Sequence, residues 1–100
     1  MKTILTTDTF DLWFEKLRDN QAKARIKARL RRAGDGNLGD VKPVGEGISE
    51  MRIHYGAGYR LYFMQYTFEI VLLLAGGDKS TQVNDIQSAL ELARKVKERK

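Results

Sequence analysis

The order of hydrophobic and polar positions predicts two helices in the first third of the chain. Apolar residues recur at three- and four-residue spacing over residues 10–17, the period of an amphipathic helix, and Thr7 or Asp8 can cap its start. A second apolar stripe of helical period runs through residues 22–33. Only a short connection around Asp19 and Asn20 joins the two helices. We therefore expect them to fold back on each other as an antiparallel hairpin.

The pattern changes to an alternation of period two after a glycine-rich turn at residues 33–40. The elements predicted beyond this turn are an edge strand at 41–45, strands at 49–55 and 59–66, a central strand at 68–75 that is apolar on both faces, and a helix at about 80–98. A further short strand is predicted at residues 2–6. This order indicates an α+β domain in which an N-terminal helical hairpin packs on a small antiparallel sheet, with a C-terminal helix.

The two alternating strands form a hairpin whose turn we place at residues 56–58, because the glycines there can take positive φ. The cross-strand pairs that this turn predicts are Tyr55 with Tyr59, His54 with Arg60, and Arg52 with Tyr62. The polar members then share one face of the hairpin, and the apolar members face the core. A slip of one residue would reverse the two faces, so the pattern constrains the register.

Composition limits the chemistry that is available. The chain has 100 residues, which suits a single domain over residues 1–100, and a formal net charge of +5, with no cysteine and one histidine. These counts exclude disulfides, thiolate metal sites, cysteine nucleophiles and multi-histidine metal sites, and the scattered acids show no spacing typical of a two-metal nuclease. We therefore expect no metal and no cofactor. Without a membrane-length apolar run or a signal peptide, a cytoplasmic location is predicted.

The second predicted helix carries a concentrated positive charge. Between residues 21 and 32 it holds six of the eighteen basic residues and no acid. They are Lys23, Arg25, Lys27, Arg29, Arg31 and Arg32. Like charges four residues apart destabilise a helix by about 0.2–0.5 kcal/mol per pair, so a use for them is a better explanation than solubility alone. We predict that they contact nucleic-acid phosphates without reading sequence; the alternative is an ordinary solvated face.

The polar face of the hairpin is the candidate site. Arg52 and Arg60 can hold a phosphate and its transition-state charge, while His54 or Tyr62 can move a proton. Lys79 follows a glycine pair and precedes the last helix, where unpaired backbone N–H groups favour anions. The alternative interpretation is that the outer face of any sheet is polar.

Four blocks of sequence, taken together, carry a family resemblance. They read GDGNLGD at 34–40, VGEGISEMRI at 44–53, GYRLYF at 58–63 and LAGGDKSTQ at 74–82. With these blocks the chain resembles the RelE/ParE superfamily of toxins from bacterial type II toxin–antitoxin modules, and more narrowly its short HigB-like branch, often labelled addiction module killer protein. The resemblance covers most of the chain and implies the RelE-like fold, two helices followed by an antiparallel sheet and a C-terminal helix.

The resemblance also implies an activity and partners. Many members of the superfamily are metal-independent endoribonucleases that cut mRNA in the ribosomal decoding site, leaving a 2′,3′-cyclic phosphate and a 5′-hydroxyl. They are neutralised by a cognate antitoxin, usually a product of the adjacent gene, here expected to be of the helix-turn-helix type. Position by position, Arg60 matches the hairpin arginine that stabilises the phosphate. Arg52 falls in the strand where nuclease members carry basic residues, and Lys79 lies near a basic position after the last core strand.

One departure from the family pattern leaves the proton-transfer residue open. Ribonuclease members of the best-known branch carry a tyrosine early in the C-terminal segment, and residues 80–86 here contain none. His54, Tyr62 or Asp85 would have to substitute. The prediction is a ribosome-dependent mRNA interferase that arrests growth, with antitoxin, ribosome and mRNA as partners and no membrane. The alternatives are a ParE-like inhibitor of DNA gyrase, which cuts nothing, and a passive basic nucleic-acid-binding module.

Overall fold

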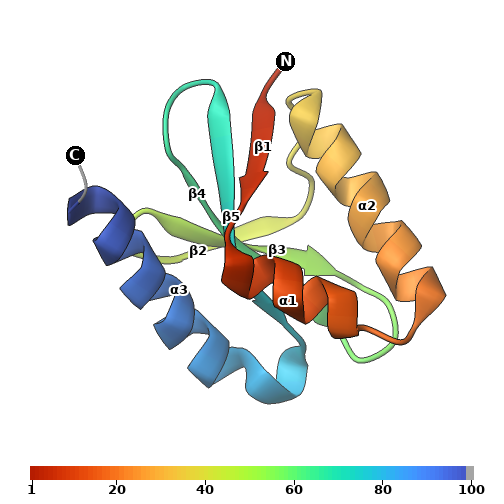
Figure 1. Ribbon diagram of the computed structural model, residues 1–100. Coiled ribbons are helices and arrows are strands. Elements are labelled where there is room, and N and C mark those ends of the chain that lie inside the picture. Colours follow the sequence, from red (N-terminus) through yellow and green to blue (C-terminus); the bar gives the residue numbers. More distant parts are fainter. Residues whose placement is uncertain (99–100) are drawn as a thin grey trace.

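The computed structural model describes residues 1–98 and places a five-stranded sheet between helices (Figure 1). The elements are β1 (Thr3–Thr6), α1 (Asp8–Lys16), α2 (Asn20–Gly34), β2 (Val41–Gly45), β3 (Ile48–Ile53), β4 (Tyr59–Gln65), β5 (Ile70–Gly77), the 3-10 turn η1 (Lys79–Thr81) and α3 (Gln82–Glu98). The predicted α+β class and the C-terminal helix are confirmed. Within residues 1–98, none of the helices combines the length and the apolar character needed to cross a membrane.

The sheet is mixed rather than wholly antiparallel, which corrects the prediction. Its strand order is β1-β5-β4-β3-β2, and β1 lies parallel to β5 while all other neighbours are antiparallel. The leading strand β1 can reach β5 in parallel because residues 7–69 separate the two strands and form a long crossover. β5 is an interior strand, but it begins at Ile70; Phe68, which the sequence placed in this strand, is 86% exposed in the preceding turn.

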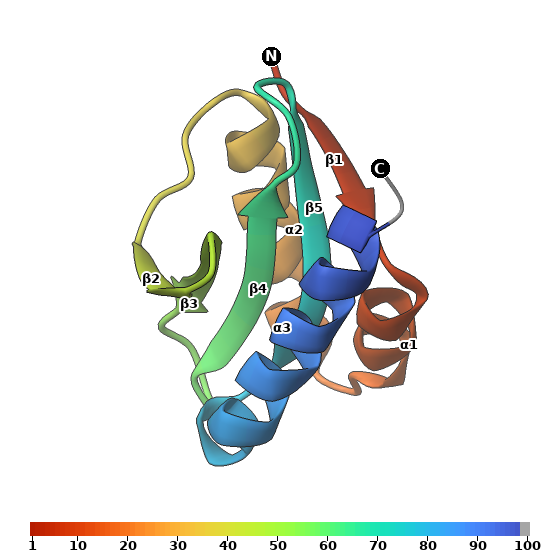
Figure 2. The ribbon, with the colours of Figure 1, turned by 90° about the vertical axis from the view of Figure 1, so that its left-hand side faces the viewer.

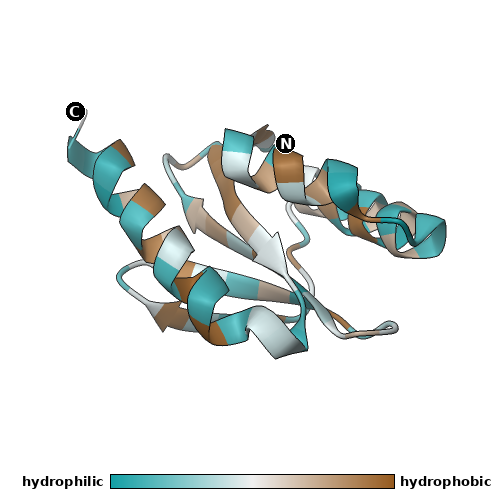
Figure 3. Cartoon of the chain, turned by 60° about the horizontal axis from the view of Figure 1, so that its bottom comes forward, coloured by the Kyte–Doolittle hydropathy of each residue, from teal (hydrophilic) through white to brown (hydrophobic). Residues whose placement is uncertain are grey.

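Each face of the sheet carries its own hydrophobic core. One face packs under α1 and α2, and its buried residues are Phe10, Ile26, Ala33, Met51, Ile53, Leu61, Phe63, Val71 and Leu73. The other packs under α3, with Ile48, Tyr62, Met64, Leu74, Ala75, Ala89 and Ala93. Figure 2 shows the sheet between α3 on the near side and α2 behind it. Figure 3 shows hydrophobic and hydrophilic positions alternating along α3, as expected for a helix with one buried stripe.

The first two helices cover the same face but do not form the predicted hairpin. Thr7 caps α1 by accepting a hydrogen bond from the Phe10 amide at 3.1 Å, and Asp19 caps α2. The end of α2 returns to the start of β1, where the Lys2 amide donates to the Gly34 carbonyl at 2.6 Å. Since α1 starts at the opposite end of β1, the two helices fan apart from their junction (Figure 1).

The β3–β4 register differs by two residues from the predicted one. The observed pairs are Glu50 with Tyr62, Met51 with Leu61, Arg52 with Arg60 and Ile53 with Tyr59. The strands are joined by a five-residue loop, 54–58, because Tyr55 leaves the sheet and packs against the start of α2, where its hydroxyl lies 3.1 Å from the Gln21 side-chain oxygen. A shift of two preserves the side-chain alternation, so the predicted division of the hairpin into two faces is confirmed.

The polar face is not the solvent face that the sequence suggested. α3 packs across it, so that Tyr62 is fully buried and Glu50 is 2% exposed. The end of this face beside the β3–β4 loop is open, because Arg52 and Arg60 line a pocket there. The hairpin therefore contributes both a buried polar cluster and an accessible pocket.

Candidate functional site

A pocket of about 270 Å³ lies where the β3–β4 loop meets the start of η1. Its lining residues are Arg52, Ile53, His54, Gly58, Tyr59, Arg60 and Lys79. Four of the five predicted catalytic residues are brought together here from three elements and a loop. The Lys79 amide donates to the Ala57 carbonyl at 3.4 Å, which holds η1 against the loop.

Asp40 binds the two pocket residues that come from the end of β3 and the loop after it. Its Oδ1 accepts a hydrogen bond from Arg52 Nη2 at 3.0 Å, and its Oδ2 lies 2.5 Å from His54 Nε2. The bond from Arg52, and then that from His54, lowers the pKa of the Asp40 carboxyl. The same pairing raises the pKa of Arg52. Asp40 itself does not line the pocket.

Arg60 faces a second internal carboxylate. Its Nε lies 3.5 Å from Glu50 Oε1, and Gln82 at the start of α3 donates to Glu50 Oε2 at 3.2 Å. Arg52 and Arg60 stand directly opposite each other on the two strands, and each guanidinium has its own carboxylate partner, Asp40 for Arg52 and Glu50 for Arg60. Arg60 Nε and Nη1 are buried and make no hydrogen bond within residues 1–98, so its charge is only partly satisfied by the fold.

Tyr62 is the one predicted catalytic residue that does not reach the pocket. Its side chain lies under α3, and its buried hydroxyl makes no hydrogen bond within the described part of the chain. Burial, with the charges of Glu50 and Asp85 nearby, raises the pKa of Tyr62 far above its usual range. Asp85, the third residue left open for proton transfer, does not line the pocket either; burial raises its pKa, and it accepts a hydrogen bond from Thr81.

Lys79 is exposed, and its ammonium group makes no hydrogen bond or ion pair among residues 1–98. The predicted anion site at the backbone beside it needs a correction, however. The backbone N–H of Ser80 is taken by the Asp78 side chain at 2.8 Å, so the start of the C-terminal helical segment already holds an anion of its own. Lys79 therefore contributes its side-chain charge to the pocket, without an N-terminal anion site beside it.

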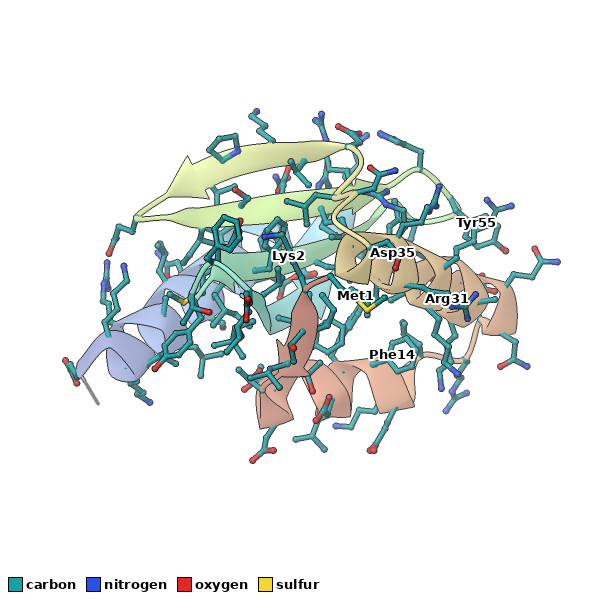
Figure 4. The ribbon with its side chains drawn as sticks, turned by 90° about the horizontal axis from the view of Figure 1, so that it is seen from above. Met1, Lys2, Phe14, Arg31, Asp35 and Tyr55 are labelled. Atoms are coloured by element: carbon teal, nitrogen blue, oxygen red, sulfur yellow. The ribbon has the colours of Figure 1, made fainter. Side chains whose placement is uncertain are left out.

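The six basic residues of α2 separate into two stripes. Arg25, Arg29 and Arg32 line a second pocket of about 310 Å³ that shares Ile53 and His54 with the first. The other stripe, Lys23, Lys27 and Arg31, turns toward α1. Figure 4 shows Arg31 on the side of α2 that faces Phe14, and Tyr55 on the opposite side.

Several of these cations are already engaged within the fold. Arg29 donates through Nη1 to the Arg52 carbonyl at 2.6 Å and through Nη2 to the carbonyls of Leu38 and Asp40, so its guanidinium holds α2 against β3 and the turn before β2. Its role in RNA binding stays a prediction. Arg25 lies over the ring of Tyr55 at 4.5 Å. The ammonium groups of Lys23 and Lys27 lie over the Phe14 ring at 5.4 and 6.0 Å. The Arg32 side chain lines the second pocket and makes no hydrogen bond, ion pair or ring contact within residues 1–98.

The sequence missed Asp40 as part of the site. It stands at the end of the glycine-rich turn, and it reaches Arg52 only because β2 pairs with β3, with the Arg52 amide donating to the Asp40 carbonyl at 3.0 Å. Asp40 and Arg52 are twelve positions apart in the sequence, and no local sequence pattern predicts a contact between a turn aspartate and a strand arginine at that separation. The only signal was that the turn ends in an acid directly before an edge strand. Among the described residues, no group of three or more histidine, aspartate or glutamate side chains is arranged to hold a metal ion.

The fold and the pocket together define a small α+β domain with a cationic site at one end of a mixed sheet. No protein-family model matches the chain, and no solved structure matches it. It is 50% identical over 93 residues to an uncharacterized protein of Haemophilus influenzae, an alignment that covers 93% of this chain and 94% of that protein. The chain belongs to the same family as this protein.

Proposed function

We propose that the chain is the toxin of a type II toxin–antitoxin pair, of the RelE/ParE kind with the RelE-like fold, and that it cuts mRNA on the ribosome without a metal. The observation that carries the proposal is the convergence of Arg52, His54, Arg60 and Lys79 on one pocket. A site of this composition suits a phosphodiester, whose charge rises in the transition state. The same proposal includes a cognate antitoxin that neutralises the chain and a location in the bacterial cytoplasm.

The proposed roles follow from the internal contacts of each side chain and from its access to the pocket. Lys79 is an unpaired charge among the described residues, and Arg60 is held in place by Glu50 while it lines the pocket. Both can stabilise the scissile phosphate. His54, which is 75% exposed at its side chain, is the proton-transfer group, since Tyr62 and Asp85 lie outside the pocket. Rate enhancement then comes from orientation and preorganised positive charge.

The neighbouring pocket supports a path for the RNA strand. Arg25 and Arg32 lie beside it, and His54 stands between the two pockets. A strand whose scissile phosphate occupies the first pocket would place a flanking phosphate near this stripe. Such contacts add affinity but carry no base information.

The test replaces Lys79, whose ammonium group has no partner among the described residues. Arg60→Ala is less suitable, because removing one partner of a buried pair leaves Glu50 unpaired at a cost of about 3–5 kcal/mol. Wild type, Lys79→Ala and the matched control Lys95→Ala, an exposed lysine of α3, are induced in bacteria without antitoxin, and the 5′ ends of transcripts are mapped. We expect growth arrest and cuts within codons bearing 5′-hydroxyl ends. Lys79→Ala should lower cleavage about 10- to 100-fold, and Lys95→Ala should not.

Two results would overturn the proposal. Intact transcripts together with an SOS response and stalled gyrase would identify a gyrase inhibitor. Unimpaired growth on strong induction of wild type would leave a passive nucleic-acid-binding module.

A further inference from the structure

Asp40 is bound to its surroundings through both its side chain and its backbone. Its carboxylate bridges Arg52 and His54, and its backbone carbonyl accepts hydrogen bonds from the Arg52 amide at 3.0 Å and from Arg29 Nη2 at 3.3 Å. Partners on β3 and α2 thus restrain it from two sides. Of the residues that the structure describes, His54, which Asp40 contacts, and Ile53 are the two that line both pockets.

The geometry decides which ring nitrogen of His54 carries the proton. The bond from Arg52 favours the ionised form of Asp40, which can only accept hydrogen bonds. His54 Nε2, 2.5 Å from Asp40 Oδ2, must therefore be the donor. A neutral ring then has its free lone pair on Nδ1, the nitrogen that Asp40 does not bind.

The surroundings of His54 offer no substitute for this carboxylate. The charged groups that line the pockets with it are Arg52 from β3, Arg60 from β4, Lys79 from η1, and Arg25, Arg29 and Arg32 from α2. All of them are cationic, and a cation cannot accept the Nε2 proton. Within the described residues, Asp40 is the anion that contacts the ring.

We propose that Asp40 is a positioning residue that keeps the imidazole proton on Nε2 and leaves Nδ1 of His54 as the base for the ribose 2′-hydroxyl, an inference that rests on the ribonuclease function proposed above. In this step the hydroxyl proton passes to Nδ1 and the 2′ oxygen forms a bond to phosphorus. The bond between phosphorus and the 5′ oxygen breaks, and the leaving oxygen takes a proton from a water molecule. That water recovers a proton from Nδ1, which returns the ring to its neutral form. Asp40 touches neither the RNA nor the reacting atoms.

The kinetic test is a double-mutant cycle on ribosome-dependent cleavage. Asp40→Ala should lower kcat about 10- to 100-fold, because the His54 ring is no longer held with its proton on Nε2. KM should not rise, because Arg52 loses its carboxylate partner and becomes free to bind the phosphate. In a His54→Ala background the same change should have no further effect on kcat, because Asp40 acts through the ring. Asp40→Glu, which keeps a carboxylate, should recover part of the rate. Asp35→Ala, at an exposed aspartate of the same turn, is the matched control and should leave kcat unchanged.

A spectroscopic test separates this inference from the function itself. Nuclear magnetic resonance of the ¹⁵N-labelled wild-type chain at a pH of about 8.5, above the ordinary range of an imidazole, should find the His54 proton on Nε2 and protected from exchange. In Asp40→Ala that protection should be lost. A wild-type ring protonated on Nδ1, additive effects in the cycle, or RNA binding that tightens in Asp40→Ala with kcat unchanged would each overturn the role of Asp40. Absence of cleavage by wild type would overturn the function, and the role of Asp40 with it.

Discussion

The hydroxyl of Tyr62 lies in the sheet face that α3 covers, and it makes no hydrogen bond within residues 1–98. Arg60, two residues earlier on the same strand, lines the pocket and is 14% exposed at its side chain. Two residues of one strand face thus differ in access, because Tyr62 belongs to the core under α3 and Arg60 lines the pocket. The fit of a residue to a catalytic role depends here on its position along the strand as much as on its type.

A substitution at Tyr62 tests this distinction. Tyr62→Phe removes a buried hydroxyl that has no partner among the described residues, and whose desolvation costs about 1–3 kcal/mol. We expect cleavage within about twofold of wild type and a free energy of unfolding that is equal or higher, measured by urea titration. His54→Ala should lower cleavage about 100-fold in the same assay. Loss of cleavage in a folded Tyr62→Phe protein would instead assign proton transfer to Tyr62.

At the scale of elements, α2 carries one apolar stripe and two basic stripes. Its apolar stripe, with Ala22, Ile26 and Ala33 buried, fixes the helix on the sheet. This placement turns one basic stripe toward the pockets and the other toward Phe14 of α1. Position on the helix, rather than net charge, should decide which cations bind RNA.

Paired substitutions test the two stripes at equal charge. Arg25→Ala/Arg32→Ala and Lys27→Ala/Arg31→Ala each remove two positive charges, and each breaks one contact between a cation and an aromatic ring. Binding of a short single-stranded RNA is measured over a series of salt concentrations. The first pair should weaken binding about tenfold and lower the slope of log K against log salt by about 1.4, near 0.7 for each phosphate that is no longer neutralised. The second pair should change the slope much less, and equal changes in the two slopes would contradict the assignment.

At the scale of the whole molecule, the site depends on a close approach between α1 and the end of β5. A Cβ atom at Gly76 would overlap the Trp13 indole, and a Cβ atom at Gly77 would overlap the Asp85 carboxylate. Trp13 also packs against Tyr59, with ring centroids 6.4 Å apart, and Tyr59 lines the pocket. The glycine pair therefore allows helices on both faces of the sheet to approach the strand that leads to Lys79.

Two glycine substitutions test this packing. Gly76→Ala should destabilise the fold by about 1–3 kcal/mol, because the indole has to move in a packed core. Gly34→Ala is the control: the added methyl meets only ordinary van der Waals neighbours at the end of α2 and should stabilise the protein by about 0.4–1 kcal/mol. Thermal unfolding measures both changes, and an unchanged melting temperature for Gly76→Ala would contradict the close approach.

The local pattern determined the elements and the faces of this protein. Helical spacing in residues 10–33 and alternation in residues 49–66 arise from the geometry of the chain itself, so the helices, the hairpin and its two faces could be predicted from neighbours in sequence. The edge strand containing Pro43 could be predicted for the same reason, since proline lacks the N–H that an interior strand must donate. The gathering of Arg52, His54 and Arg60 also followed, because a hairpin brings its two strands together.

Tertiary contacts decided the rest. Tyr55 packs on α2 instead of pairing across the hairpin, so the loop is longer and the register is shifted by two residues. The strand β1 pairs in parallel with β5, although residues 7–69 lie between them, and this pair makes the sheet mixed. The pairing of Asp40 with His54 needs β2 beside β3, and the burial of Tyr62 needs α3 across the sheet. Each of these outcomes depends on groups that are distant in sequence and meet only in the folded chain. A local pattern is compatible with several such arrangements, and burial and electrostatic pairing select one of them.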